Sequence, residues 1–173
     1  IDRIASLTRE HWGLGMGPIN DVILAVEKNG FIVARNSLTE YGLDACSQWK
    51  SNRPYIFLGS STGSASRLRF DVAHELGHLL LHSHLSPQDL AEKSVMDRAE
   101  KEANRFASAF LLPLETFTQE VMCTSLNHFI HLKSRWKVSI AAMLYRCSDL
   151  GLLSDNQVLY LRKQLSRMGR KVE

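Results

Sequence analysis

The sequence lacks the features of a secreted or membrane-spanning protein. No apolar run reaches the roughly 18 residues that a membrane-spanning helix needs, and no basic segment followed by an apolar one opens the chain as in a signal peptide. The three cysteines, Cys46, Cys123 and Cys147, are widely spaced and form no Cys-x-x-Cys pair. We therefore predict reduced thiols, each a small buried hydrophobic side chain, in a cytoplasmic protein with no membrane association.

A strong net charge is also missing, because the formal net charge is only +3. Overall charge therefore gives no argument for nucleic-acid binding. The positive charge is concentrated after Ile130, where nine basic and three acidic residues give a net charge of +6. A basic surface there could meet an acidic partner or a phosphate backbone, although a solvated helix face is the simpler interpretation.

The spacing of apolar residues predicts an α+β fold that is mostly helical. The 173 residues are enough for one domain, or for one domain with a helical appendage. Pro18 begins a predicted helix, and Asn29-Gly30 ends it. Three short strand candidates follow, at residues 31–34, 43–49 and 55–58. Together they predict a small, mostly antiparallel three-stranded sheet.

From Arg67 onward the apolar spacing becomes helical. It predicts one helix at about residues 67–82 and a second at about 98–111, which Pro113 closes. Three more helices are predicted, at residues 126–136, 140–150 and 155–168. We therefore divide the chain into a core at residues 1–125 and a helical C-terminal subdomain at residues 126–173, which could resemble a helix-turn-helix.

The first of these helices carries the sequence His74-Glu75-Leu76-Gly77-His78. Residues four apart lie on one face of a helix, so His74 and His78 can bind one Zn²⁺ through neutral ring nitrogens. Glu75 can accept a proton from a zinc-bound water, whose pKa falls to roughly 7. Gly77 leaves room for another backbone to pack closely. The alternative is a pair of solvated histidines on an amphipathic helix that binds no metal.

A catalytic zinc site needs a third protein ligand. His84 follows at the metzincin spacing, but Leu81 stands where that pattern needs a glycine to turn the chain back. His82 lies on the same helix face as His74 and His78 but one turn further on, which is too far along the helix axis to complete a tetrahedron of ligands around the zinc. The remaining candidate is a carboxylate on the next predicted helix.

On that next helix, Glu100 and Asn104 are four apart and share a face. This spacing allows Glu100 to be a metal ligand while the amide of Asn104 hydrogen-bonds another ligand and orients it. Glu102 points about 200° away from Glu100, so only one of the two can face the metal. Both could instead be surface acids that pair with nearby basic side chains, and for Glu102 we favour that interpretation.

Two blocks of the sequence together resemble the ImmA/IrrE family of zinc metallopeptidases. The first block runs from Arg67 to His82, and the second runs from Glu100 to Ala107 and is followed by Leu111-Leu112-Pro113. The second block is similar to the family signature E-x-x-A-N-x-F-A, whose leading glutamate is the third zinc ligand. The resemblance therefore implies Glu100 in that role, and it extends from about Trp12 to the end of the chain.

One position departs from this family pattern. Asp71 stands where the family usually carries a small or hydroxyl residue. It lies almost one turn before His74, so we expect it either to hydrogen-bond the His74 ring without touching the metal or to cap the helix. An oxyanion-stabilising side chain is also expected, and the spacing does not choose among four candidates, Tyr41, His128, His131 and Tyr145.

The resemblance implies a zincin-like metallopeptidase core at residues 1–125 that cleaves a regulatory protein. The expected substrate is a helix-turn-helix repressor or antitoxin-like partner of a prophage, another mobile element or a stress regulon. Glu75 would take a proton from the attacking water and pass it to the leaving amine. Many members carry the peptidase after an XRE-type DNA-binding domain, and a chain that starts at Ile1 would fit the removal of such a domain.

Two other functions compete with proteolysis. The chain could be a zinc-peptidase-like sensing or binding module of a transcriptional regulator, with little or no proteolysis. Alternatively, residues 126–150 could bind DNA as helix, turn and helix. Few polar side chains on the second of these helices suit the reading of base edges, so we do not favour direct nucleic-acid binding. The sequence leaves the oligomeric state open.

Overall fold

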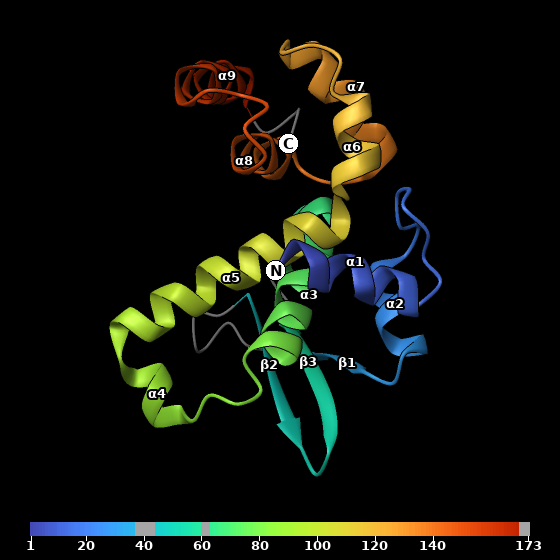
Figure 1. Cartoon of the computed structure of the whole chain (residues 1–173), viewed down its shortest axis with the longest axis vertical. Helices are drawn as coiled ribbons and strands as arrows, with labels where there is room; N and C mark the ends of the chain where they lie inside the picture. The colour runs from blue at the N-terminus through green and yellow to red at the C-terminus, as the bar shows by residue number, and fades with distance from the viewer. Residues whose placement is uncertain (37–43, 60–62, 170–173) are drawn as a thin grey trace.

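The computed structural model describes residues 1–36, 44–59 and 63–169. In Figure 1 a small sheet lies at one end, the long helices α3 and α5 cross the middle, and a group of shorter helices lies at the other end. The helices of the described residues are α1 (Asp2–His11), α2 (Val22–Lys28), α3 (Ala65–Leu81), α4 (Pro87–Ala91), α5 (Lys93–Leu111), α6 (Leu114–Glu120), α7 (Leu126–Trp136), α8 (Ile140–Asp149) and α9 (Asp155–Met168). The strands are β1 (Ile32–Asn36), β2 (Ala45–Lys50) and β3 (Arg53–Gly59). The predicted mostly helical α+β fold is confirmed. In the described part of the chain, none of the helices has both the length and the apolar character needed to span a bilayer.

The sheet has the strand order β1-β3-β2. β2 and β3 form an antiparallel hairpin whose two turn residues, Ser51 and Asn52, both have positive φ angles, 49° and 59°. Such a turn matches the twist of the strands it joins. β1 pairs with β3 in parallel, with Ile32 opposite Tyr55. The three strands are confirmed, but the sheet is mixed rather than mostly antiparallel, because a local turn fixes the hairpin while no local signal fixes where β1 pairs.

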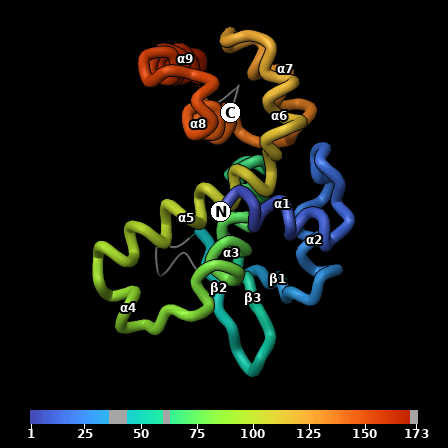
Figure 2. The backbone as a smooth tube through the Cα atoms, in the orientation of Figure 1, coloured from blue at the N-terminus to red at the C-terminus, as the bar shows by residue number. Residues whose placement is uncertain are grey.

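Helix α3 lies against the sheet, as the tube in Figure 2 also shows. Its N-terminus is capped by the Ser64 side chain, which accepts a hydrogen bond from the Arg67 amide. Val72 and Leu76 on α3 are fully buried, as is Ile56 on β3. The apolar face of α3 is therefore directed into the core, which leaves its histidine face to meet α5.

Several helices differ from what the apolar spacing predicts. α2 begins at Val22 after the Asp21 cap rather than at Pro18, and the short helices α4 and α6 are not predicted. α5 begins at Lys93 rather than near Arg98, because its first turn is largely exposed and its apolar Met96 stays 40% exposed instead of joining the buried face. α1 is not predicted at all. It buries Arg9, whose guanidinium donates to the backbone oxygen of Phe110 on α5, while Ile4 on its outer face is 41% exposed.

The C-terminal helices α7, α8 and α9 coincide with the predicted ranges to within a residue. Lys137 adopts a left-handed conformation that ends α7. Arg146 on α8 is 1% exposed and pairs with Asp2 on α1 and with Asp149, so α8 is joined to the N-terminal helix. The division of the chain at residues 125 and 126 stays a prediction.

The cysteines are free thiols with different surroundings. Cys147 is buried, as predicted, and Cys46 is half-buried. The prediction of a buried side chain is wrong for Cys123, which is exposed in the segment before α7. That segment is short and irregular, so it offers no apolar layer in which to bury a thiol.

Candidate metal centre

Two histidines of α3 and one glutamate of α5 converge on one point. The Nε2 atoms of His74 and His78 are 3.0 Å apart. The Glu100 carboxylate lies across from them, with Oε2 3.4 Å from His74 Nε2 and Oε1 3.2 Å from His78 Nε2. Zinc bonds of roughly 2.0–2.1 Å in a tetrahedron place the ligand atoms about 3.3 Å apart, so the three side chains fit one Zn²⁺. In the described part of the chain, no other three potential ligands gather in this way.

Gly77 explains why α5 comes close enough to contribute a ligand. A Cβ atom at Gly77 would lie 3.2 Å from the Ala103 Cα and 3.1 Å from the Phe106 ring. The expectation that another backbone packs closely against Gly77 is therefore confirmed. Ala103 lies about one turn after Glu100 on α5, so this contact also sets how near the Glu100 carboxylate comes to the histidines.

Asn104 occupies the position that the sequence suggested for it. Its Oδ1 atom is 3.1 Å from His74 Nδ1, and both residues are half-buried. When Nε2 of His74 faces a metal, Nδ1 carries the hydrogen and donates it to the amide oxygen. Asn104 can therefore hold the His74 ring in the orientation that metal binding needs.

Asp71 makes neither of the contacts that the sequence suggested. The two ring nitrogens of His74 face Asn104 on one side and the His78–Glu100 pair on the other. The N-cap of α3 is Ser64, seven residues before Asp71 in the sequence. The expectation that Asp71 bonds the His74 ring or caps the helix is therefore wrong, because Asn104 on α5 bonds that ring and Ser64 caps α3.

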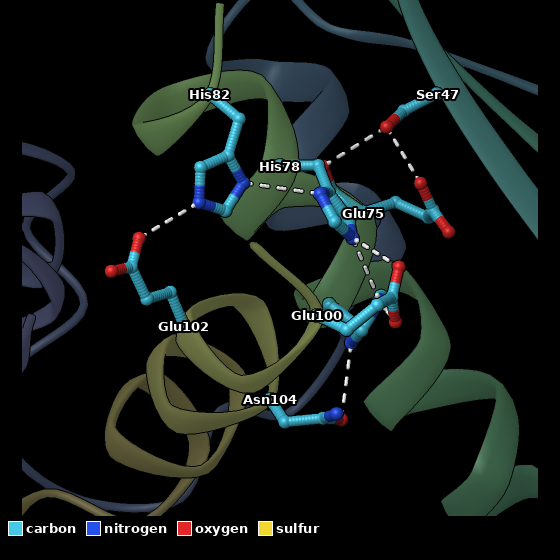
Figure 3. Close-up of polar contacts among 8 residues, drawn as sticks. Ser47, Glu75, His78, His82, Glu100, Glu102 and Asn104 are labelled. Atoms are coloured by element: carbon cyan, nitrogen blue, oxygen red, sulfur yellow. Dashed lines mark hydrogen bonds and ion pairs between the residues drawn. The ribbon is translucent and has the colours of Figure 1, made fainter. Parts of the chain in front are cut away.

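His82 and Glu102 form a chain of contacts behind His78 (Figure 3). His78 Nδ1 is 3.1 Å from His82 Nδ1, and His82 Nε2 is 3.1 Å from Glu102 Oε2. His82 is therefore outside the ligand group, as predicted, and His84 is exposed on the segment after α3. Glu102 is also outside the ligand group, as predicted, but its partner is His82 on the neighbouring element rather than Arg98, Lys101 or Arg105 on its own helix. Sequence spacing could not show this pair, because it depends on how α3 and α5 cross.

Glu75 lies beside the ligand group and is 8% exposed. Its Oε2 atom accepts a hydrogen bond of 2.6 Å from the Ser47 hydroxyl on β2 (Figure 3). Burial, together with the charges of Glu100 and Asp71, raises the pKa of the Glu75 carboxyl to about 7, although the Ser47 hydrogen bond opposes the shift. A carboxyl with such a pKa can both take up and release a proton near neutral pH. Nothing in the sequence marked Ser47, a single hydroxyl in a short strand.

The two histidines are held in the neutral form that binds metals. Burial, together with the neighbouring rings of His74 and His82, lowers the pKa of His78 to about 4. Burial also lowers the pKa of His74, although the Glu100 carboxylate opposes that shift. Neutral imidazoles offer a lone pair to a cation without first losing a proton.

Among the described residues, none of the oxyanion-stabilising candidates enters this group. Tyr41 lies outside the described residues. The other three lie on α7 and α8, at the end of the molecule opposite the sheet (Figure 1). The His128 ring bonds to the backbone oxygen of Glu120, His131 is exposed, and Tyr145 lines a hollow against α9.

Comparisons with known proteins agree with this site. The family described as Peptidase_M78, IrrE N-terminal-like domain, matches residues 26–148, which include both helices of the candidate centre. No curated protein sequence matches the chain. A solved structure of a Mycobacterium tuberculosis transcriptional regulator is similar at a TM-score of 0.59 and 20% identity, covering 85% of this chain and 46% of that one. That likeness shows a shared fold, and this chain spans less than half of the regulator's length. The chain belongs to the Peptidase_M78 family of IrrE N-terminal-like domains.

Proposed function

We propose that the chain is a zinc-dependent endopeptidase that cleaves a regulatory protein. The observation that carries the proposal is the convergence of His74, His78 and Glu100 at separations of 3.0–3.4 Å, with the buried Glu75 beside them. Two neutral imidazoles and one carboxylate form a ligand set that zinc peptidases use, and it leaves a fourth position for water or substrate. Membership of a peptidase family supports the same conclusion.

The residues divide the work of hydrolysis among them. His74, His78 and Glu100 would hold Zn²⁺, which supplies a Lewis acid for the scissile carbonyl and makes a water acidic enough to attack near neutral pH. Ser47 bonds Oε2 of Glu75, so we assign proton transfer to Oε1. The Glu75 carboxylate takes the proton of the attacking water at this atom and returns it to the leaving amine.

We further propose that the substrate is a repressor-like or antitoxin-like regulator. The support is indirect: the family resemblance in the sequence, and the fold shared with a protein named as a transcriptional regulator. The same likeness also favours a second function, a sensing module within a regulator that cuts little or nothing. Direct binding of nucleic acid by this chain stays disfavoured, and a duplex-binding assay at low salt tests it.

The deciding experiment is co-expression with repressor-like proteins encoded nearby. The wild type should produce a substrate fragment, whereas Glu75→Gln should produce none and still bind one zinc ion per chain, because Glu75 is not a ligand. Glu115→Gln is the matched control, since Glu115 is an exposed glutamate on α6. Zinc binding without cleavage of any partner would favour the sensing module. A wild type that binds no zinc would refute the metal centre itself.

A further inference from the structure

A chain of polar contacts leads away from the candidate metal centre through His82 to Glu102. The rings of His78 and His82 lie 5.1 Å apart, with 3.1 Å between their Nδ1 atoms. The His82 side chain is 7% exposed and the Glu102 side chain 39% exposed, so the chain runs from the interior to the surface. It lies on the same two helices that carry the three ligands (Figure 3).

The hydrogens in this chain have one consistent order when His78 binds a metal through Nε2. His78 Nδ1 then carries the hydrogen and donates it, so His82 Nδ1 must accept it with a lone pair. The remaining hydrogen of a neutral His82 is consequently on Nε2, 3.1 Å from the Glu102 oxygen. An ionised carboxylate only accepts hydrogen bonds, so Glu102 favours this tautomer of His82 and disfavours the other.

We propose that His82 and Glu102 are positioning residues of the zinc centre. Glu102 fixes the tautomer of His82, and His82 in turn holds the His78 ring with Nε2 toward the metal. The inference rests on the zinc centre of the proposed function. It gives His78 a support of two side chains, whereas His74 has the single amide oxygen of Asn104.

A purely structural role makes a different prediction. His82 is the C-cap residue of α3, so its replacement could simply loosen the contact between α3 and α5. A loosened contact lowers the stability of the metal-free chain. Loss of a positioning residue weakens zinc binding by more than the change in metal-free stability can explain. In addition, replacing Glu102 should affect zinc binding only when His82 is present.

The test is the zinc dissociation constant of the whole chain, measured by competition with a chelator at fixed pH. His82→Ala should weaken zinc binding about 10- to 100-fold, and Glu102→Ala about 10-fold, as expected for groups that orient a ligand. The double variant should bind zinc no more weakly than His82→Ala alone, because Glu102 has no other route to the metal. The controls His84→Ala and Asp97→Ala replace an exposed histidine and an exposed acidic residue and should stay within about twofold of the wild type.

Conservative variants and metal-free stability complete the design. Glu102→Gln keeps an oxygen that can accept from His82 Nε2, so it should retain most of the zinc affinity that Glu102→Ala loses. Thermal unfolding of the metal-free variants, followed by circular dichroism, should show changes too small to account for the lost affinity.

Two results would overturn the inference while leaving the zinc centre intact. One is wild-type zinc affinity in both His82→Ala and Glu102→Ala. The other is a further loss of affinity when Glu102→Ala is added to His82→Ala. A wild type that binds no zinc would overturn both this inference and the proposed function, and it is distinguished by the wild-type measurement alone.

Discussion

Replacing Gly77 with alanine would test how the metal centre depends on the close contact between α3 and α5. The new Cβ would lie 3.1 Å from the Phe106 ring, 3.2 Å from the Ala103 Cα and 3.3 Å from the Ala103 backbone oxygen. Carbon atoms in comfortable contact are about 3.5–4.0 Å apart. Two of the three neighbours are backbone atoms, which cannot rotate aside, so α5 has to move away by roughly 0.3–0.5 Å.

Two opposing terms decide the change in the free energy of unfolding. Alanine is a better helix former than glycine by about 1 kcal/mol in the middle of a helix. Overfilling a packed contact costs about 1–3 kcal/mol. Because the obstruction is backbone, we expect the packing cost to exceed the helix gain, with a net loss of about 1 kcal/mol in the metal-free protein.

The same movement separates the ligands. Glu100 is about one turn from Ala103 on α5, so a retreat of α5 lengthens its distances of 3.4 Å and 3.2 Å to the histidine nitrogens. We expect zinc affinity to fall about tenfold, since misplacement of a functional group by a fraction of an ångström has effects of this order. Urea unfolding measures the stability, and chelator competition measures the affinity.

Gly17→Ala is the control for this substitution, because a Cβ atom at Gly17 meets nothing within 4 Å. It should leave zinc affinity unchanged. The reasoning is refuted if Gly77→Ala is more stable than the wild type by the full helix gain of about 1 kcal/mol and binds zinc equally well. That outcome would mean that α5 is not held at its present distance by the absence of a side chain at Gly77.

Three further predictions follow from the described contacts. Glu100→Ala should abolish retention of zinc through dialysis, because two imidazoles alone do not form a closed site, and metal analysis of the dialysed protein checks this. Burial raises the pKa of Asp2, but its hydrogen bonds and charge interactions with Arg146 and Arg105 outweigh that effect, so its pKa is lowered. A lowered pKa in the folded state gives stability that is fully present above about pH 4 and is lost as the pH falls through the folded-state pKa. The free energy of unfolding of Asp2→Asn should therefore change less with pH below about 4 than that of the wild type. Urea unfolding at a series of pH values measures this, and the same pH dependence in the variant and the wild type would contradict the prediction. Cys123 is exposed, and hydrogen bonds from Ser125 lower the pKa of its thiol, whereas burial raises the pKa of Cys147 to about 12. A thiol reagent should therefore label Cys123 first and Cys147 only on unfolding, as mass spectrometry would show.

The sequence by itself determined the features that depend on neighbours within a few residues. The spacing of His74 and His78 places both rings on one face of a helix wherever that helix lies. The ranges of α7, α8 and α9 follow from apolar spacing, because each buries one face and has a hydroxyl or turn residue at its start. The helix carrying Glu100 and Asn104 was also found in this way, although its exposed first turn was not.

Only the tertiary structure decided which side chains meet across elements. The contacts of Ser47 with Glu75 and of Glu102 with His82 join residues 28 and 20 positions apart in the sequence. They depend on the position of β2 beside α3 and on the crossing of α3 and α5 at Gly77. The parallel pairing of β1 with β3 is of the same kind. Periodicity shows which face of an element is buried, but the choice of the partner on that face results from packing over the whole chain, which no local pattern contains.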